Sequence, residues 1–221
     1  MFFYDRFANE FDSHMNRYDL NKRLRILFEE LLTPGEIAGK DLLDAGCGTG
    51  WFSQKAFELG ANVTSLDVGD NLLNEVKAKC NSKLVKGDVC AMEFDDNMFD
   101  YVIATEVIEH TSSPRQAIKE MHRVLKPNGV ILLTVPNKIW HFSVSVANAL
   151  KLRPYEGYEN WVGWFELKRW LNDIGFDICK MYGFHVLPFV SPILYPIIDY
   201  FDKFRRLGPA MINIAVKGTK T

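Results

Sequence analysis

The sequence predicts an α/β protein with a doubly wound, mostly parallel sheet, and three observations lead to this expectation. Short apolar segments typical of buried strands alternate with segments of helical periodicity over most of the chain. A glycine-rich turn at 46–50 joins the first such strand to the helix after it. The segment VILLTV at 130–135 is wholly apolar, which is typical of a strand buried on both faces of a sheet.

The expected elements follow one another in regular order. A first helix begins near Asp19, because leucines recur at helical spacing as far as Leu31, and Pro34 ends it. Strands are then expected at 41–45, 62–67, 83–86, 99–104, 130–135, 176–182 and 211–216. Helices are expected from the glycine-rich turn to residue 60 and at 70–80, 114–125 and 165–174, with a turn at 126–129.

The composition is that of one ordinary globular domain. Hydrophobic residues make up 48% and charged residues 24% of the 221 residues, so we expect a single domain over 1–221. The formal net charge of −2 argues against nucleic-acid binding. The four cysteines have no zinc-binding spacing, and the first residues do not form a signal peptide, which favours a cytoplasmic location.

Three segments fall outside the alternation and are expected to cover the sheet. Residues 1–33 are expected to form an N-terminal helical cover, and the inserts at 136–164 and 184–208 are expected to form helical lids. The first insert begins at the carboxyl end of a parallel strand, where ligands bind in open α/β sheets. Its aromatic residues either line an apolar pocket or pack the lid onto the sheet.

The second insert combines apolar and aromatic residues with a basic cluster at Lys203, Arg205 and Arg206. This pattern fits a lid, a dimer contact or a contact with a membrane surface, and the last would be peripheral at most. No segment has the roughly 20 consecutive apolar residues that a membrane-spanning helix needs.

Acidic and glycine residues at the expected strand ends form a nucleoside-binding pattern. Asp44 precedes a turn with glycines at 46, 48 and 50, which lets the backbone approach a ligand closely. The spacing differs from the G-x-G-x-x-G pattern of dinucleotide-binding proteins. Asp67 ends the next strand, where an acid would hold the hydroxyls of a ribose. Asp88 follows the third strand and is placed to accept a hydrogen bond from an adenine amino group.

These segments resemble the motifs of class I S-adenosylmethionine (AdoMet)-dependent methyltransferases. The resemblance covers about residues 40–136 and rests on five segments: LLDAGCGTG, VTSLD, GDV, FDYVIATEVIEH and HRVLKPNGVILLTVPN. It implies a Rossmann-like sheet of seven strands with the last strand antiparallel, and AdoMet as the cofactor. It also implies that Gly46, Cys47 and Gly48 line the methionine moiety, that Asp44 supports its amino group, and that Asp67 and Asp88 hold ribose and adenine. The full expected cofactor-binding set is Asp44, Gly46, Cys47, Gly48, Gly50, Asp67, Val68, Asp88, Val89 and Thr105.

Within the superfamily, EVIEHTSSP and the insert after TVPN are most similar to ubiquinone-biosynthesis-type O-methyltransferases. The implied reaction is methyl transfer from AdoMet to a small-molecule or lipid-like acceptor, at a hydroxyl group. In that group an arginine of the N-terminal helix touches the cofactor, and Arg17 and Arg23 are both candidates here.

A hydroxyl acceptor must lose its proton, and His110, just past the fourth strand, is the expected general base. On a helical turn Glu106 would share a face with His110 and orient the imidazole. A purely structural role for this edge is the alternative. A second alternative is a divalent cation held by Glu106, Glu109 and His110, although no metal is included in the expected site. His141 and His185 lie in the inserts, where they are candidates to line the acceptor pocket.

Other classes of function remain open at this point. The protein is an N- or C-methyltransferase if the acceptor atom is nitrogen or carbon, or a non-catalytic AdoMet-binding module if no methyl group is transferred. A nicotinamide-dependent oxidoreductase would use a similar sheet, but the glycine spacing argues against it.

Overall fold

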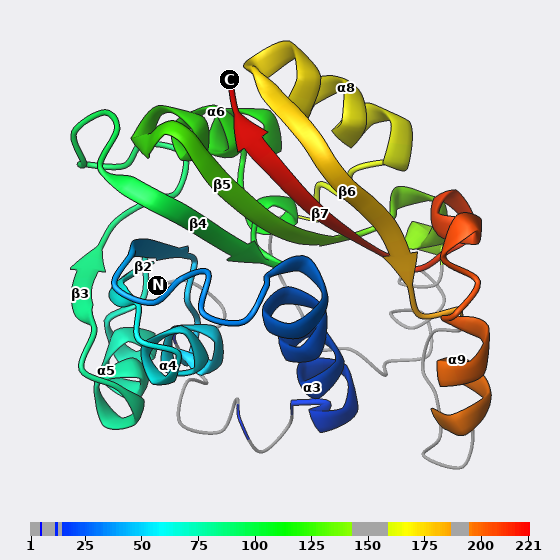
Figure 1. The fold of residues 1–221 in the computed structure, drawn as a ribbon, viewed down its shortest axis with the longest axis horizontal. Coiled ribbons are helices and arrows are strands. Elements are labelled where there is room, and N and C mark those ends of the chain that lie inside the picture. Colours follow the sequence, from blue (N-terminus) through cyan, green and yellow to red (C-terminus); the bar gives the residue numbers. More distant parts are fainter. Residues whose placement is uncertain (1–4, 6–11, 13–14, 143–158, 187–194) are drawn as a thin grey trace.

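The computed structural model describes residues 5, 12, 15–142, 159–186 and 195–221, and its centre is a seven-stranded sheet (Figure 1). The strands lie in the order β3-β2-β1-β4-β5-β7-β6. Strands β1 to β5 pair in parallel, whereas β7 is antiparallel to both β5 and β6. This confirms the seven-stranded sheet with its last strand antiparallel. The strand bounds are β1 Asp41–Ala45, β2 Asn62–Asp67, β3 Lys83–Lys86, β4 Phe99–Thr105, β5 Leu125–Pro136, β6 Phe176–Phe184 and β7 Asn213–Lys220.

Helices cover both faces of the sheet, so that two apolar cores form. On one face, residues of α6 and α8 pack against β4, β5 and β7, with Ile118 and Leu171 fully buried. On the other, η1 and α4 pack against β1, β4 and β5, with Leu27 fully buried. The helices are α3 Arg17–Arg25, the π-helix η1 Ile26–Leu31, α4 Trp51–Glu58, α5 Asp70–Lys79, α6 Pro114–Val124, α8 Trp164–Ile174 and α9 Tyr195–Phe201, and the short 3-10 turns are η2 Ile108–His110, η3 Lys138–Trp140 and η5 Arg205–Ala210.

Helix α3 begins at Arg17, two residues before the expected start at Asp19. Asn16 caps it, because its side-chain oxygen accepts hydrogen bonds from the backbone N–H groups of Tyr18 and Asp19. The helical path then continues through η1 to Leu31, which places the whole expected apolar stripe against the sheet.

A buried charge cluster joins this N-terminal helix to the second insert. Lys22 of α3 is 5% exposed, and its Nζ lies 2.7 Å from Asp199 Oδ1 and 2.5 Å from Asp202 Oδ2, next to the C-terminal half of α9. The hydroxyl of Tyr18 donates to Asp199 Oδ1 at 2.7 Å, and its ring stacks on Tyr195 with 3.7 Å between centroids. Two segments far apart in the sequence are therefore held together at one end of the sheet.

Two boundary predictions were wrong. The expected turn at 126–129 is counted within β5, but the pairing with β4 is irregular there: Leu125 pairs with Phe99, and regular pairing resumes only at Val130. Asn128 has a φ of 64°, so the backbone still turns sharply within the strand. The last strand was expected to end with its apolar run at 216. It continues to Lys220, because β5 and β6 both supply backbone partners for the polar residues.

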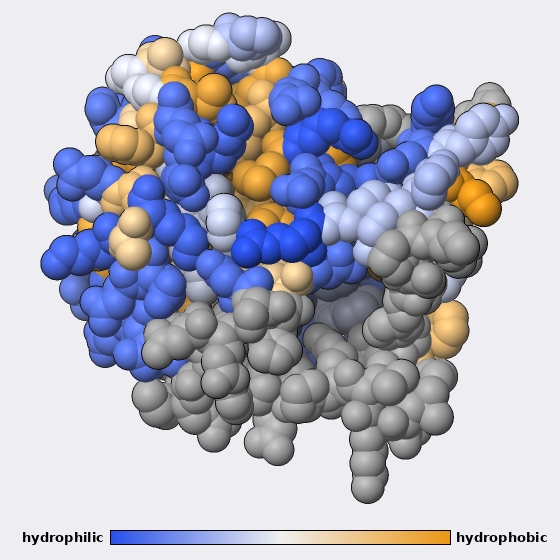
Figure 2. Space-filling model, turned by 90° about the horizontal axis from the view of Figure 1, so that it is seen from below, coloured by the Kyte–Doolittle hydropathy of each residue, from blue (hydrophilic) through white to orange (hydrophobic). Residues whose placement is uncertain are grey.

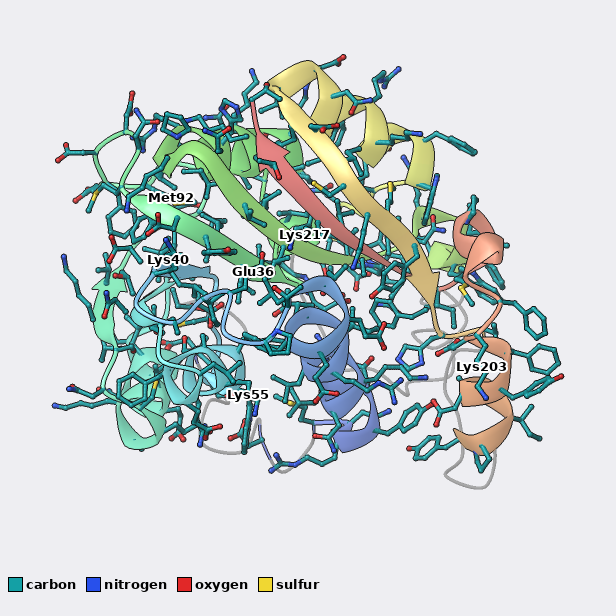
Figure 3. The ribbon with its side chains drawn as sticks, viewed as in Figure 1. Glu36, Lys40, Lys55, Met92, Lys203 and Lys217 are labelled. Atoms are coloured by element: carbon teal, nitrogen blue, oxygen red, sulfur yellow. The ribbon has the colours of Figure 1, made fainter. Side chains whose placement is uncertain are left out.

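Viewed from below the orientation of Figure 1, the described surface of the protein is mostly hydrophilic, and hydrophobic residues show between the polar ones (Figure 2). Glu36, in the turn after η1, and Lys217 of β7 lie next to each other over the sheet (Figure 3). Their ion pair of 2.7 Å joins the turn before β1 to the last strand. Within the described ranges, no helix combines the length and apolar character needed to cross a membrane.

The glycine-rich turn after β1 offers a test of how tightly the sequence is constrained. Gly46 has a φ of 76°, and an added Cβ would lie 2.5 Å from Cγ1 of Val107. Gly39 has a similar φ of 70°, but its Cβ would meet nothing within 4 Å. Left-handed strain should therefore cost Gly39→Ala about 1–2 kcal/mol, and steric overlap should cost Gly46→Ala a further 1–3 kcal/mol or so.

Urea denaturation of the two variants measures this difference in the free energy of unfolding. Equal losses in both would show that the contact of Gly46 with Val107 is easily relieved.

Candidate active site

The carboxyl ends of β1 and β2 bring the predicted acids and the glycine-rich turn together. These strands are parallel neighbours, so Asp44 pairs with Ser65 and Asp67 ends the adjacent strand. The carboxylate of Asp67 accepts hydrogen bonds from the backbone N–H of Gly48 at 2.9 Å and of Gly69 at 3.0 Å. Asp67 thereby fixes the turn after β1 against the loop after β2.

Two buried carboxyl groups give this edge of the sheet its electrostatic character. Asp44 is 1% exposed, and burial raises its pKa to about 7, although Ser53 Oγ donates a hydrogen bond to Asp44 Oδ2 at 2.6 Å. Burial also raises the pKa of Asp67, against the opposing effect of the N–H groups of Gly69 and Gly48. Burial disfavours the charged form of both acids, so a cationic ligand group nearby would be bound favourably.

The other predicted cofactor residues surround these two acids. Asp88 is exposed after β3, and its carboxylate accepts from the backbone N–H of Cys90 at 2.8 Å. Val89 is buried, whereas Val68 and Thr105 are partly exposed at the ends of β2 and β4. Burial raises the pKa of the Cys47 thiol well above its ordinary value, so Cys47 is a packing residue and not a nucleophile.

The turn itself leaves room on one side. Gly46, Gly48 and Gly50 all have φ between 52° and 87°, the left-handed region that glycine adopts without strain. A Cβ added at Gly48 would meet nothing within 4 Å, whereas at Gly50 it would lie 2.9 Å from Val76 Cγ2. The open side at Gly48 fits the close approach of a ligand, and the glycine at 50 is explained by helix packing.

Two N-terminal acids that the sequence did not single out contact the same loops. Asp12 accepts hydrogen bonds from Thr49 Oγ1 at 2.6 Å and Trp51 Nε1 at 2.9 Å, and pairs with Lys79 at 2.8 Å. Asp5 Oδ1 accepts from the backbone N–H at position 71, next to the loop that binds Asp67. Partners so distant in the sequence give no local signal, so no spacing pattern identifies these contacts.

The sheet edge that carries Glu106 and His110 is the expected acceptor side. Its backbone geometry differs from the prediction. Glu106 has a φ of 52°, and helical geometry begins only at Ile108, so the shared helical face expected for Glu106 and His110 is wrong. The Glu106 carboxylate instead accepts a hydrogen bond from Asn213 Nδ2 of β7 at 3.1 Å. Glu109 Oε1 lies 4.0 Å from His110 Nε2.

Arg23 of α3 takes part in a polar group on the same side. It forms an ion pair with Asp19, and Asp19 Oδ1 lies 2.9 Å from His185 Nε2. Burial raises the pKa of Glu106, and the charge of Arg23 opposes that rise. Among the described residues, Arg23 Nε and Glu106 Oε1 are both buried without a hydrogen-bond partner. The other candidate, Arg17, lies 4.6 Å from the ring of Trp51, beside the glycine-rich turn.

A cleft of about 640 Å³ opens next to the acceptor side, between the loops that follow β4 and β5. Its lining includes Ser113, Lys138, His141, Trp161 and Trp170. The end of the first insert forms one wall of the cleft. It is attached to the segment after β4, because the backbone N–H of Asn160 donates to the carbonyl of Glu109 at 2.8 Å. His141 lines this cleft, whereas His185 belongs to the polar group around Asp19.

The metal alternative requires Glu106, Glu109 and His110 to converge on one cation. Across the part of the chain that the structure describes, no three or more His, Cys, Asp or Glu side chains come together as a metal-binding group. The helical face on which Glu106, Glu109 and His110 were to meet is also missing.

Taken together, the sheet order, the antiparallel last strand, the glycine-rich turn and the acid at the end of β2 define a class I methyltransferase domain. The comparisons with known proteins agree. The family model described as a methyltransferase domain matches residues 43–133.

Among curated proteins, ubiquinone biosynthesis O-methyltransferase of Pseudomonas paraeruginosa is 31% identical over 159 residues, covering 66% of this chain and 68% of that protein. Demethylmenaquinone methyltransferase of Staphylococcus aureus is 32% identical over 172 residues, covering 66% and 71%. Among solved structures, magnesium protoporphyrin IX methyltransferase from Synechocystis, with bound S-adenosylhomocysteine, has a TM-score of 0.68 at 16% identity and covers 99% of this chain and 94% of that one.

The chain belongs to the S-adenosylmethionine-dependent methyltransferases. Its cofactor is therefore AdoMet, as the sequence predicted. The oxidoreductase alternative is excluded by this assignment, and the likeness to the Synechocystis enzyme, at its low identity, supports the fold alone.

The central position of Asp67 leads to a test of its role in cofactor binding. S-adenosylhomocysteine should raise the melting temperature, because it binds the folded state, and NAD should not. Asp67→Ala should weaken S-adenosylhomocysteine binding by about 1–3 kcal/mol, the usual cost of losing a charge-assisted hydrogen-bond acceptor. Isothermal titration calorimetry measures the change, with Asp95→Ala as the control because Asp95 is an exposed acid away from the turn. Unchanged affinity in Asp67→Ala would remove Asp67 from the site.

The raised pKa of Asp44 leads to a second test, of stability against pH. Because the folded pKa of about 7 lies above the ordinary value of 3.8, the folded state binds the proton more tightly. The free energy of unfolding should therefore fall as the pH rises from about 4 to about 7, by at most about 4 kcal/mol from this group.

Asp44→Asn should remove this fall and leave the protein more stable than the wild type above pH 7. Denaturant titrations at several pH values, with Asp95→Asn as the matched exposed control, measure it. Parallel stability profiles for wild type and Asp44→Asn would contradict the argument.

Proposed function

We propose that this protein transfers the methyl group of AdoMet to a hydroxyl group of a small, amphiphilic acceptor of the quinone type. The observation that carries the proposal is the 31% identity to ubiquinone biosynthesis O-methyltransferase over two thirds of the chain. The name of the second relative, demethylmenaquinone methyltransferase, also refers to a quinone. The polar acceptor side and the adjoining cleft with its two tryptophans suit an acceptor that is part polar and part apolar.

For the cofactor, we assign Asp67 to the ribose hydroxyls, Asp88 with Val89 to the adenine, and Asp44 to the ammonium of the methionine moiety. The buried, partly protonated Asp44 supports this assignment, because a neighbouring ammonium would stabilise its charged form. Gly46, Cys47 and Gly48 line the methionine moiety, with the open side of Gly48 as the closest approach. Gly50, Val68 and Thr105 complete the surroundings. When bound, the cofactor supplies an electrophilic methyl group on a sulfonium.

For the acceptor, we assign to His110 the removal of the hydroxyl proton. Its side chain is 21% exposed, so an acceptor can reach it, and Glu109 is near enough to stabilise the protonated imidazole. We also retain Glu106 in the proposed catalytic site, because it lies on the same polar edge. Its carboxylate accepts a hydrogen bond from Asn213. The main contribution of the fold is to hold the acceptor oxygen in line with the methyl group.

This assignment predicts the kinetics of a His110→Ala variant. Its turnover should fall by about 10²–10⁴-fold, the usual contribution of a general base. The affinity for S-adenosylhomocysteine should change little, and EDTA should have no effect on the wild type.

Loss of activity in EDTA, restored by Mg²⁺, with equal damage from Glu106→Ala and Glu109→Ala, would instead favour the metal alternative. Near-normal turnover of His110→Ala together with no response to EDTA would show that neither mechanism operates.

The acceptor atom is tested by a screen of quinol, lipid and sugar acceptors with labelled AdoMet, followed by identification of the methylated atom. Label on oxygen supports the proposal, whereas label on nitrogen or carbon would replace it by the corresponding methyltransferase. Binding of S-adenosylhomocysteine without transfer to any acceptor would favour a non-catalytic module.

A further inference from the structure

Three serine side chains connect the buried carboxyl group of Asp44 to a partly exposed position at the edge of the sheet. Ser53 Oγ lies 2.6 Å from Asp44 Oδ2 and 2.7 Å from Ser65 Oγ. Ser65 Oγ lies 2.8 Å from Ser82 Oγ. Each of these distances is that of a good hydrogen bond between oxygen atoms. We call Ser53, Ser65 and Ser82 the serine network.

The fold places the serine network on one face of the sheet. Asp44 of β1 pairs with Ser65 of β2, so their side chains lie side by side on the same face. Ser53 belongs to α4, whose apolar residues pack on that face, and Ser82 comes directly before β3. Ser53 and Ser65 are fully buried, whereas Ser82 is partly exposed. Ser82 is therefore the end at which the serine network meets solvent.

The surroundings of Asp44 favour its neutral form. Burial raises the pKa of Asp44 to about 7, and the negative charge of Asp67 acts in the same direction, against the hydrogen bond from Ser53. The thiols of Cys47 and Cys80 also face this carboxyl group, and burial raises the pKa of both, so they stay neutral. Below pH 7 or so, Asp44 therefore keeps its proton until a positive charge comes close.

The serine network can satisfy Asp44 in both of its protonation states. Each hydroxyl group has one hydrogen to donate and lone pairs with which to accept. When Asp44 is protonated, its O–H donates to Ser53, Ser53 donates to Ser65, and Ser65 donates to Ser82. When Asp44 is ionised, each hydrogen points the other way, and Ser53 donates to the carboxylate. The buried groups thus keep their partners in either state, which avoids the penalty for a buried polar group without one.

We propose that the serine network couples AdoMet binding to the release of one proton from Asp44 to solvent. As the ammonium of the methionine moiety approaches, the O–H bond of Asp44 breaks. Each serine hydroxyl accepts one proton and passes its own hydrogen to the next, so that one proton leaves Ser82 to water. Asp44 is then ionised beside the ammonium, and Ser53 donates to it.

The three serines are therefore positioning residues, which act on the cofactor through Asp44. The inference rests on the proposed assignment of Asp44 to the ammonium. It adds a pH dependence to cofactor binding: the affinity should rise with pH until Asp44 is ionised in the free protein, and then level off. A ligand without an ammonium group should show no such dependence.

Isothermal titration calorimetry of the full chain tests the proposal. S-adenosylhomocysteine carries the ammonium, whereas 5′-methylthioadenosine lacks the amino acid part. Titrations between about pH 6 and about pH 8, in buffers with different heats of ionisation, count the protons released. The variants are Ser53→Ala, Ser65→Ala and Ser82→Ala. The control is Thr64→Val, because Thr64 is a nearly buried hydroxyl of the same strand that pairs with Leu43 and faces the other side of the sheet.

The wild type and Thr64→Val should release about one proton per S-adenosylhomocysteine near pH 6, fewer near pH 8, and none per 5′-methylthioadenosine. Ser53→Ala should bind S-adenosylhomocysteine about tenfold more weakly near pH 6, because the ionised carboxylate loses a hydrogen bond. This difference should narrow toward pH 8. Ser65→Ala should shift the pH profile in the same direction by less, and Ser82→Ala by least. The affinity for 5′-methylthioadenosine should stay at the wild-type value.

Two results would overturn the proposal. In the first, Ser53→Ala loses affinity equally for both ligands, which would give the serine network a purely structural role. In the second, the pH profiles of the serine variants coincide with that of the wild type. Ser82→Ala changes a partly exposed residue, so it supplies a folded variant for this comparison even if a buried substitution prevents folding.

Asp44→Asn separates this inference from the proposed function. If Asp44→Asn binds S-adenosylhomocysteine as the wild type does and still releases a proton, the assignment of Asp44 to the ammonium is wrong. If Asp44→Asn abolishes proton release while the serine variants behave as the wild type, only the inference is contradicted.

Discussion

The two backbone hydrogen bonds to Asp67 are the interaction on which the cofactor half of this protein depends. They tie the turn after β1 to the loop after β2, and the parallel pairing of the two strands places both loops at one edge. Asp67 is nearly buried, and the two hydrogen bonds use only part of its lone pairs. The carboxylate can therefore position the backbone and also accept from a ligand. Asp44, on the neighbouring strand and more deeply buried, adds a second carboxyl group. Its ionisation costs free energy as long as no cation lies nearby.

The proposed acceptor half is built in a different way, from side chains that meet across long stretches of sequence. Arg23 and Asp19 come from α3, His185 follows β6, and Glu106 is bound by Asn213 at the start of β7. The contact of Asp19 with His185 joins α3 to the residue after β6, and the hydrogen bond of Asn213 with Glu106 joins the start of β7 to the end of β4. The position of the covering helix thus depends on polar contacts as well as on the apolar stripe that packs η1 on the sheet.

This difference explains what could be predicted from the sequence. The strands, their order of appearance and the acids at their ends follow from local apolar patterns, and the structure agrees within a few residues, except that β5 begins early and β7 runs on. The antiparallel last strand came from family resemblance. The helical face expected for Glu106 and His110 failed, because the backbone turns left-handed at Glu106 before helical geometry begins. The contacts of Asp12 and His185 depend on tertiary packing, which no spacing pattern encodes.

The polar group under α3 also has an energetic consequence for acceptor selection. Within the described chain, Arg23 Nε is a buried donor and Glu106 Oε1 a buried acceptor, and neither has a hydrogen-bond partner. Each such atom costs the fold about 1–3 kcal/mol. A hydroxyl both donates and accepts, so a hydroxyl group reaching both atoms would recover part of that cost, whereas an apolar group of the same size would not. These two buried atoms would therefore favour a polar over an apolar group at the acceptor site proposed above.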